Sequence, residues 1–187
     1  MNARRPVSRT TGRFVLTGPP GGGKTPLLAE LATLGFKAVP EPARAILAEQ
    51  RAVDGDGVPE RNRQLFFDLM LERAVDNYNT HDSGFFDRAI PDLIGYALIF
   101  ELDPSGARQA AEQHAYEEPI FFLPSWEEIY TNDDERNATF EQATAFGELI
   151  RDAYTELGYT IVDVPKDTPR ARAAFVSQML NPGNNDA

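Results

Sequence analysis

The segment Gly18-Pro19-Pro20-Gly21-Gly22-Gly23-Lys24-Thr25 matches the phosphate-loop (P-loop) pattern G-x-x-x-x-G-K-[ST] in full. It follows the apolar run Phe14–Thr17 and precedes a helical pattern. Glycines in such a loop let successive backbone N–H groups converge on phosphate oxygens, and the following helix start adds further donors. We therefore predict a nucleotide site in which Lys24 reaches the β- and γ-phosphates and Thr25 ligates Mg²⁺. A glycine-rich turn arising by chance is the much rarer alternative.

The composition of the 187-residue chain indicates one globular domain, with 42% apolar and 25% charged residues. The absence of cysteine excludes disulfides and thiolate metal sites. A net charge of −11 disfavours general nucleic-acid binding. No apolar run approaches the roughly 18 residues of a membrane helix, and the Arg-rich start has no signal-like apolar stretch. We therefore expect a cytoplasmic protein.

Apolar runs and helical patterns alternate along the chain, which predicts an α/β fold with a parallel sheet covered on both faces. The domain is expected over residues 13–180, between flexible tails at 1–12 and 181–187. The predicted strands are Phe14–Thr17, Phe36–Val39, Gly84–Phe86, Ile120–Leu123 and Tyr159–Val164. The predicted helices cover approximately residues 27–34, 43–52, 60–78, 92–100, 107–116, 146–157 and 169–180.

Charged residues follow the second and third predicted strands, at the edge of a parallel sheet where ligands bind. After the second strand, Glu41 is a candidate general base and Arg44 a candidate anion contact. An equally good interpretation is that Glu41 only complements a helix dipole. After the third strand, Asp87 is a candidate for the Mg²⁺ shell and Arg88 for the transferring phosphate. The alternative for this second pair is a surface ion pair.

The segments TGPPGGGKT, VPEPAR and FFDR together resemble the deoxynucleoside kinase and ribosylnicotinamide kinase group of phosphate-loop enzymes. With PSWEEIYTNDDER and ELGYTIVDVP, the pattern is most similar to a family of bacterial AAA-type ATPases related to those kinases. This resemblance implies a three-layer α/β/α P-loop NTPase fold with strand order 2-3-1-4-5. It also implies that Glu41 is the base, and that Asp87 and Arg88 occupy the Mg²⁺ and phosphate positions.

The same resemblance places Gln64 where those kinases carry a base-reading glutamine, although a solvated polar turn is equally consistent with its neighbours. Phe66, Phe67 and Tyr96 offer rings for stacking, but their helical spacing is more typical of core residues.

A charged segment after the fourth strand, at about residues 125–138, is predicted to be a short lid over the nucleotide. Arg136 is its candidate catalytic cation, and an ordinary surface ion pair is the alternative. After the last strand, the resemblance implies that Asp163 to Thr168 border adenine, chiefly by backbone contacts, with Asp163, Pro165 and Thr168 as the named contacts. No guanine-reading Asn-Lys-x-Asp segment is present, so ATP is preferred to GTP. For Arg170 and Arg172, a solvated helix face is favoured over the rim of the purine pocket.

These features predict a Mg²⁺-dependent kinase that transfers the γ-phosphoryl group of ATP to a hydroxyl of a small nucleoside-like molecule. The acceptor and the oligomeric state are not identified by the sequence. The alternative from a different class is a nucleotide-binding regulatory or scaffold protein that hydrolyses ATP or GTP slowly and has no small-molecule acceptor.

Overall fold

Five parallel strands form the centre of the computed structural model, which describes residues 11–130 and 138–181. Their order in the sheet is β2-β3-β1-β4-β5, so the implied kinase-like order is confirmed. In the central pair, Phe14 of β1 lies opposite Phe85 of β3. The strand bounds are β1 Arg13–Thr17, β2 Ala38–Val39, β3 Gly84–Asp87, β4 Ile120–Phe122 and β5 Ile161–Asp163.

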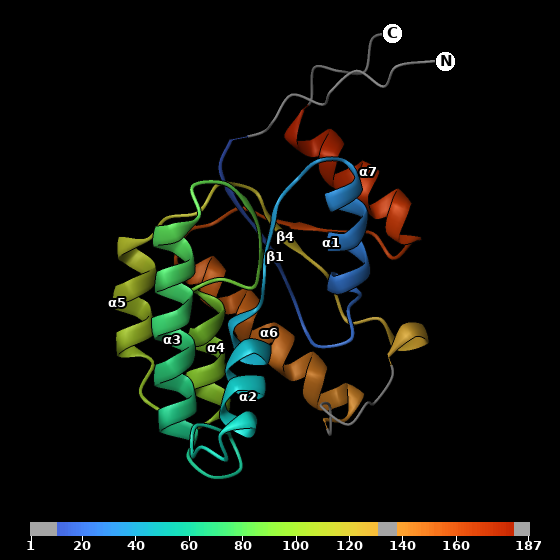
Figure 1. The fold of residues 1–187 in the computed structure, drawn as a ribbon. Helices are drawn as coiled ribbons and strands as arrows, with labels where there is room; N and C mark the ends of the chain where they lie inside the picture. Colours follow the sequence, from blue (N-terminus) through green and yellow to red (C-terminus); the bar gives the residue numbers. More distant parts are fainter. Residues whose placement is uncertain (1–10, 131–137, 182–187) are drawn as a thin grey trace, which may run out of the picture.

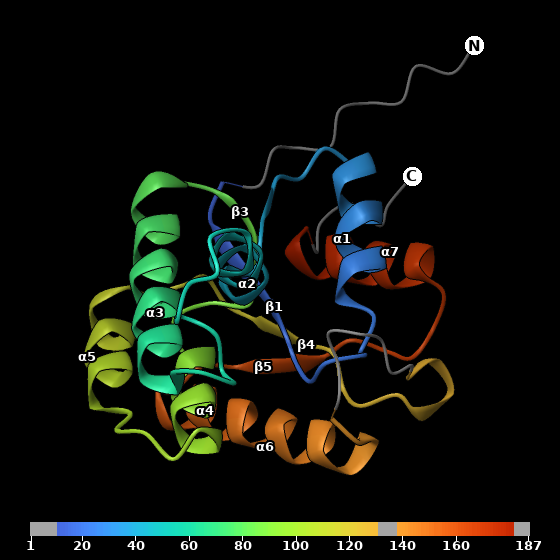
Figure 2. The same cartoon turned by 60° about the horizontal axis from the view of Figure 1, so that its bottom comes forward.

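Helices cover both faces of the sheet, which makes the three layers that the sequence predicts (Figure 1). Helices α1 and α7 pack together on one face, and α2 to α6 cover the other, as the turned view in Figure 2 also shows. The helix bounds are α1 Lys24–Thr33, α2 Pro42–Ala52, α3 Arg63–Thr80, α4 Asp92–Ile99, α5 Ser105–Gln113, α6 Phe140–Glu156 and α7 Pro169–Leu180.

Successive side chains of β1 point to opposite faces of the sheet, and those on both faces are apolar. Phe14 and Leu16 join the cluster beneath α1 and α7, whereas Val15 between them joins the cluster beneath the other helices. All three side chains are buried. A central parallel strand therefore appears in the sequence as a continuous apolar run, because each face of it meets a helical layer.

Two threonines start the helices on either side of the last strand. The hydroxyl of Thr139 accepts from the N–H of Gln142, whose side chain accepts from the N–H of Thr139, so α6 begins with a capping box. Thr168 accepts from the N–H of Ala171 and is followed by Pro169, a favourable residue for the first turn, so α7 begins there. These caps fix where α6 and α7 meet the carboxyl edge of the sheet.

Some predictions fall outside the described residues. These are most of both predicted tails, at residues 1–10 and 182–187, and the centre of the predicted lid, residues 131–137, with Arg136. The first part of that segment contains a 3₁₀ turn, η1 Glu127–Ile129. Over residues 11–130 and 138–181, the helices are too short or too polar to cross a membrane.

Candidate active site

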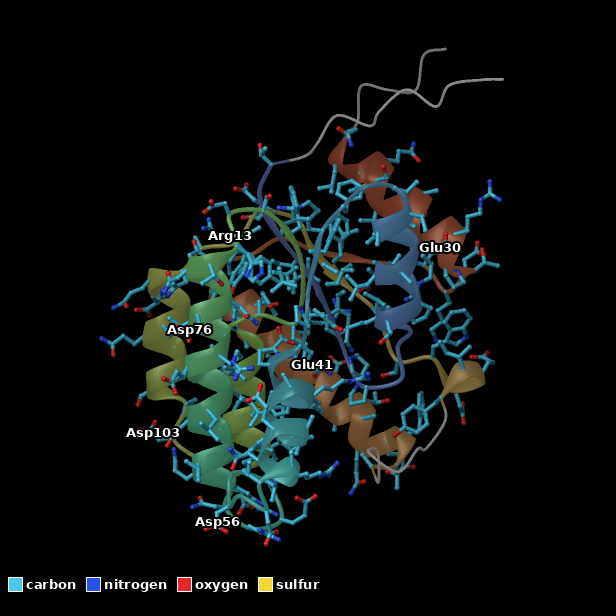
Figure 3. The ribbon with its side chains drawn as sticks, viewed as in Figure 1. Arg13, Glu30, Glu41, Asp56, Asp76 and Asp103 are labelled. Carbon is cyan, nitrogen blue, oxygen red and sulfur yellow. The ribbon has the colours of Figure 1, made fainter. Side chains whose placement is uncertain are left out.

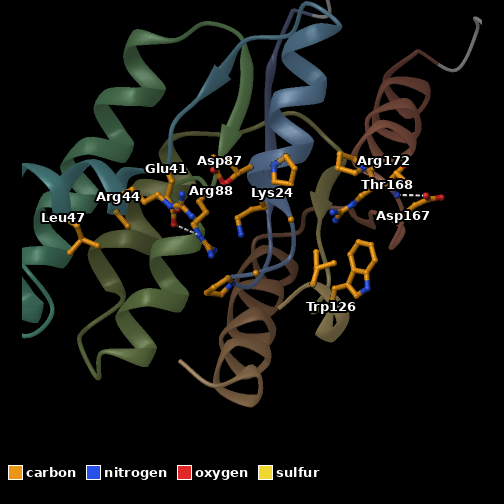
Figure 4. Close-up of a pocket in the computed structure, with 18 of the residues that line it drawn as sticks. Lys24, Glu41, Arg44, Leu47, Asp87, Arg88, Trp126, Asp167, Thr168 and Arg172 are labelled. Atoms are coloured by element: carbon orange, nitrogen blue, oxygen red, sulfur yellow. Dashed lines mark hydrogen bonds and ion pairs between the residues drawn. The ribbon is translucent and has the colours of Figure 1, made fainter. Parts of the chain in front are cut away.

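A cavity of about 740 Å³ lies at the carboxyl edge of the sheet, between the two helical layers (Figure 4). Lys24 is near its middle, with Glu41, Arg44, Asp87 and Arg88 on one side. Trp126, Asp167, Thr168 and Arg172 lie on the other side. The loops after β1, β2, β3, β4 and β5 all contribute, because the carboxyl ends of parallel strands meet at one edge.

Lys24 begins helix α1 and folds back over the phosphate loop. Its ammonium donates to the carbonyls of Gly18, at 3.1 Å, and Pro19, at 2.9 Å, and the side chain is buried. Burial, together with the nearby positive charge of Arg88, lowers the pKa of Lys24 to about 8 against the opposing pull of three carboxylates. A triphosphate in the loop would raise this pKa again by giving the ammonium an anionic partner.

Glu41 is the N-cap residue of α2, but its carboxylate turns into the cavity and makes no capping hydrogen bond. Figure 3 shows it near the middle of the molecule, whereas the exposed acids Asp56, Asp76 and Asp103 lie on the outside. Its Oε1 atom accepts from Nε of Arg88 at 2.8 Å, and Oε2 lies 3.4 Å from Nε of Arg44. Burial would raise the pKa of Glu41, but the cations around it outweigh burial and lower it.

Arg88 lies at the end of β3 with a left-handed backbone, φ 64°, which is unusual for a residue with a long side chain. Its guanidinium is buried and joins two carboxylates, Glu41 through Nε and Asp92 through Nη1 at 3.1 Å. The rings of Tyr96 and Phe146 lie 5.8 and 5.4 Å from its central carbon. Over the described residues Nη2 has no side-chain partner, so it remains available to a phosphoryl oxygen.

Two residues in the cavity suit a magnesium ion. The Thr25 side chain is exposed at the start of α1. The Oδ1 atom of Asp87 is buried and has no hydrogen-bond partner among the described residues. Burial raises the pKa of Asp87 despite the opposing charge of Lys24. Hydroxyl and carboxylate oxygens are the ligands that Mg²⁺ prefers beside phosphates, so this pair fits the ion.

Arg172 of α7 is a cavity residue for which the sequence interpretation is wrong. We expect it on a solvated face, but only 2% of the residue is exposed. Its Nη2 donates to the carbonyl of Gly22 at 3.0 Å, and its central carbon lies 5.6 Å from the ring of Trp126. The helix α7 packs along α1, which brings Arg172 beneath the phosphate loop. The adjacent Arg170 is exposed, as expected.

Several predicted site residues do not line this cavity. Gln64 is exposed at the start of α3 and donates to Asp68 at 2.8 Å. Asp163 is exposed and paired with Arg151, and Pro165 is exposed beyond it. Of the residues expected to border adenine, Asp167 and Thr168 line the cavity, and the hydroxyl of Thr168 also caps α7.

Of the three aromatic residues considered for stacking, two are in the core and one lines the cavity. Phe66 and Phe67 are buried in the core, as their spacing predicts, whereas Tyr96 lines the cavity and its hydroxyl lies 3.4 Å from Glu41. Helical spacing alone does not separate these two roles, because it identifies the apolar face of a helix without saying what lies opposite.

The sequence matches the model of a family described as AAA domain over residues 13–172. No curated protein matches it.

Solved structures share the fold at low sequence identity. The NadR protein in complex with NR has a TM-score of 0.70 at 18% identity, with 95% of this chain and 53% of that chain covered. Shikimate kinase from Acinetobacter baumannii, in complex with shikimate, has a TM-score of 0.60 at 14% identity, covering 95% and 97%. Deoxyadenosine kinase from M. mycoides with bound dCTP has a TM-score of 0.61 at 15% identity, covering 91% and 99%. The chain therefore spans about half the length of NadR and nearly the whole length of the two kinases.

Proposed function

Because this chain belongs to the AAA domain family and has a phosphate-loop kinase-like fold, we propose that it is a Mg²⁺-dependent kinase. It transfers the γ-phosphoryl group of ATP to a hydroxyl of a small nucleoside-like molecule. The observation that carries this proposal is the position of Glu41, whose carboxylate shares the cavity with Lys24 and the phosphate loop. A base facing the γ-phosphate is what transfer to a hydroxyl requires. Two of the similar structures are kinases of small molecules by name.

The residues on the two sides of Lys24 have different roles in phosphoryl transfer. The phosphate loop, which lines the cavity with Pro20, Gly21 and Gly23 to Thr25, holds the phosphates. The side with Trp126, Thr168 and Arg172 takes the nucleobase. The Glu41 side holds the acceptor, with Arg44 as a further contact. Thr25 and Asp87 would hold Mg²⁺, which neutralises phosphate charge when it is bound. Arg136 is proposed as an additional cation on the predicted lid.

The reaction needs one proton transfer and one exchange of bonds at phosphorus. Oε2 of Glu41, the carboxylate oxygen that Arg88 leaves free, takes the proton of the acceptor hydroxyl. The hydroxyl oxygen forms a bond to the γ-phosphorus, and the bond from that phosphorus to the β,γ-bridging oxygen breaks. ADP leaves with the electron pair of the broken bond. The pKa of Glu41, held low by the surrounding cations, keeps the carboxylate ionised and ready to accept the proton.

The first experiment is a search for the acceptor. The protein is incubated with Mg·ATP and pooled nucleosides, sugars and vitamins, and mass spectrometry detects a product heavier by one phosphoryl group. Formation of ADP without any phosphorylated product would instead favour the alternative function, a regulatory or scaffold protein that hydrolyses the nucleotide.

The second experiment tests the base. We expect Glu41→Gln to lower transfer by about 10²–10⁴-fold, because the amide cannot accept the proton. ATP binding, followed by the fluorescence of the single tryptophan, Trp126, should change by less than about threefold. Glu49→Gln is the matched control, since Glu49 lies on the same helix but is exposed and paired with Arg73. Full transfer activity in Glu41→Gln would remove Glu41 from the mechanism.

A further inference from the structure

Asp92, in the first turn of α4, is a fully buried carboxylate to which the sequence analysis assigns no role. Its Oδ1 atom accepts from the hydroxyl of Thr17 and from Nη1 of Arg88. Its Oδ2 atom accepts from the N–H of Ala89 at 2.9 Å and from the hydroxyl of Tyr154 at 2.7 Å. Four donors from three segments, the end of β1, the loop after β3 and helix α6, therefore converge on one side chain.

The contact with Arg88 connects Asp92 to the candidate base. Arg88 uses Nε for Glu41 and Nη1 for Asp92, so its planar guanidinium lies between the two carboxylates. Only 4% of the Arg88 side chain and 1% of the Asp92 side chain are exposed. A side chain held at two edges in this way cannot rotate away from Glu41 without breaking the pair with Asp92.

The contact with Thr17 connects the same carboxylate to the phosphate loop. Thr17 is the last residue of β1 and immediately precedes Gly18, the first residue of the loop. Asp92 thus fixes the distance between the loop and the Arg88–Glu41 pair through two bonds to a single oxygen. Such a distance decides whether a base reaches the acceptor hydroxyl beside the γ-phosphate.

Asp92 also supplies a negative charge that does not depend on Glu41. When Glu41 takes the acceptor's proton, the Arg88 guanidinium loses the charge of one of the two carboxylates that are hydrogen-bonded to it. Asp92 remains paired with Arg88 and holds it through that step. A buried ion pair adds little to stability compared with apolar residues of the same size, so stability alone is a weak reason for a carboxylate here.

We propose that Asp92 is a positioning residue that holds Arg88 against Glu41 and sets this pair relative to the phosphate loop. Its link to the reaction rests on the proposed function of Glu41, whereas its hold on Arg88 is independent of any activity. The two parts can therefore be tested separately.

The first test follows the Nε–H of Arg88 by nuclear magnetic resonance in the whole chain, without nucleotide. Arg88→Lys identifies the signal by removing it. We expect Asp92→Asn to speed exchange of this proton with solvent at least about tenfold, because the neutral amide no longer holds the guanidinium. Tyr154→Phe is the matched control, since its hydroxyl bonds the other oxygen of Asp92; the change should be less than about twofold.

The exchange rates of the backbone amide protons of β1 distinguish this local effect from a general loss of stability. If the β1 amides and the Arg88 proton accelerate equally in Asp92→Asn, Asp92 only stabilises the fold and the proposal is wrong. A crystal structure of Glu41→Ala covers the case in which Asp92→Asn does not fold. Arg88 should remain within hydrogen-bonding distance of Asp92 there, and a guanidinium that swings away would equally overturn the proposal.

The second test measures phosphoryl transfer, using the acceptor found by the search described above. We expect Asp92→Asn to lower kcat at least about tenfold while KM for ATP changes less than about threefold, and Tyr154→Phe to change neither more than about twofold. An equal decrease of kcat in Asp92→Asn and Tyr154→Phe would mean that Asp92 has only a structural role, and the proposal would be wrong. The two tests can also give different results. If the Arg88 proton exchanges faster in Asp92→Asn but the unmodified chain phosphorylates no acceptor, Asp92 still positions Arg88, and the proposal that the protein is a kinase is wrong.

Discussion

At the scale of single residues, Lys24 shows how a ligand site lowers the stability of an empty protein. Its ammonium is buried against two carbonyls and lies near the positive charge of Arg88. Burial lowers its pKa from 10.5 to about 8. Between these two values the unfolded chain binds more protons than the folded protein, so stability rises with pH in that window.

This linkage predicts the pH dependence of unfolding. From about pH 7.5 to about pH 9.5, the free energy of unfolding of the nucleotide-free protein should rise by about 1–2 kcal/mol relative to Lys24→Met. The reason is that folded Lys24 loses its proton in this range and the cost of burying the charge disappears. Urea unfolding at the two pH values measures the difference. A constant difference between the two proteins would mean that Lys24 keeps its ordinary pKa.

At the scale of elements, the turn from β1 into the phosphate loop depends on a close approach of two backbones. Gly18 has φ 129°, and a Cβ there would lie 2.2 Å from the carbonyl oxygen of Leu123, the residue after β4. Leu123 is also bonded to Thr17 through its N–H, at 2.8 Å, so it cannot easily move away. The position therefore requires glycine for both backbone conformation and space.

Two alanine substitutions separate these requirements. Gly35, after α1, also has a positive φ of 93°, but a Cβ there would meet no atom within 4 Å. We expect Gly35→Ala to lower the free energy of unfolding by about 1 kcal/mol, from strain alone, and Gly18→Ala by about 2–4 kcal/mol, from strain and overlap. Denaturant unfolding measures both changes. Equal decreases in the free energy of unfolding would show that the loop after β4 moves away from the added Cβ at little cost.

At the scale of the whole molecule, the cavity joins the two helical layers. Arg172 comes from α7 on one face of the sheet, and Glu41 and Arg44 come from the start of α2 on the other. A nucleotide bound between them contacts both layers in the folded protein, and unfolding separates these layers. Binding should therefore be visible as global stabilisation.

We expect Mg·ATP at about 100 times its dissociation constant to raise the free energy of unfolding by about 2.7 kcal/mol. Lys24→Met should lower this gain to about 1.4 kcal/mol or less at the same ATP concentration, because the phosphates lose their buried cation and binding weakens at least about tenfold. Lys166→Met is the matched control, since Lys166 is exposed and does not line the cavity. Thermal unfolding with and without Mg·ATP measures the effect, and stabilisation of Lys24→Met as large as that of the unmodified chain would place ATP elsewhere.

Local patterns in the sequence determine the phosphate loop, the alternation of strands and helices, and the residues that follow each strand. They also bring Glu41, Asp87 and Arg88 into one cavity with Lys24. The physical reason is that the carboxyl ends of parallel strands share an edge, so residues just after different strands meet regardless of sequence separation. Strand order follows from the resemblance to phosphate-loop kinases, because many orders satisfy the same local patterns.

Only the tertiary structure decides which helical side chains are buried in or beside that cavity. Arg172 and Asp92 appear in the sequence as ordinary helical charges, yet both are buried, whereas Gln64 is exposed. The outcome depends on how each helix is rotated and what packs opposite it: α1 beside α7 for Arg172, and β1, β3 and α6 around Asp92. Those contacts join residues far apart in the chain, and the local periodicity of a helix carries no information about them.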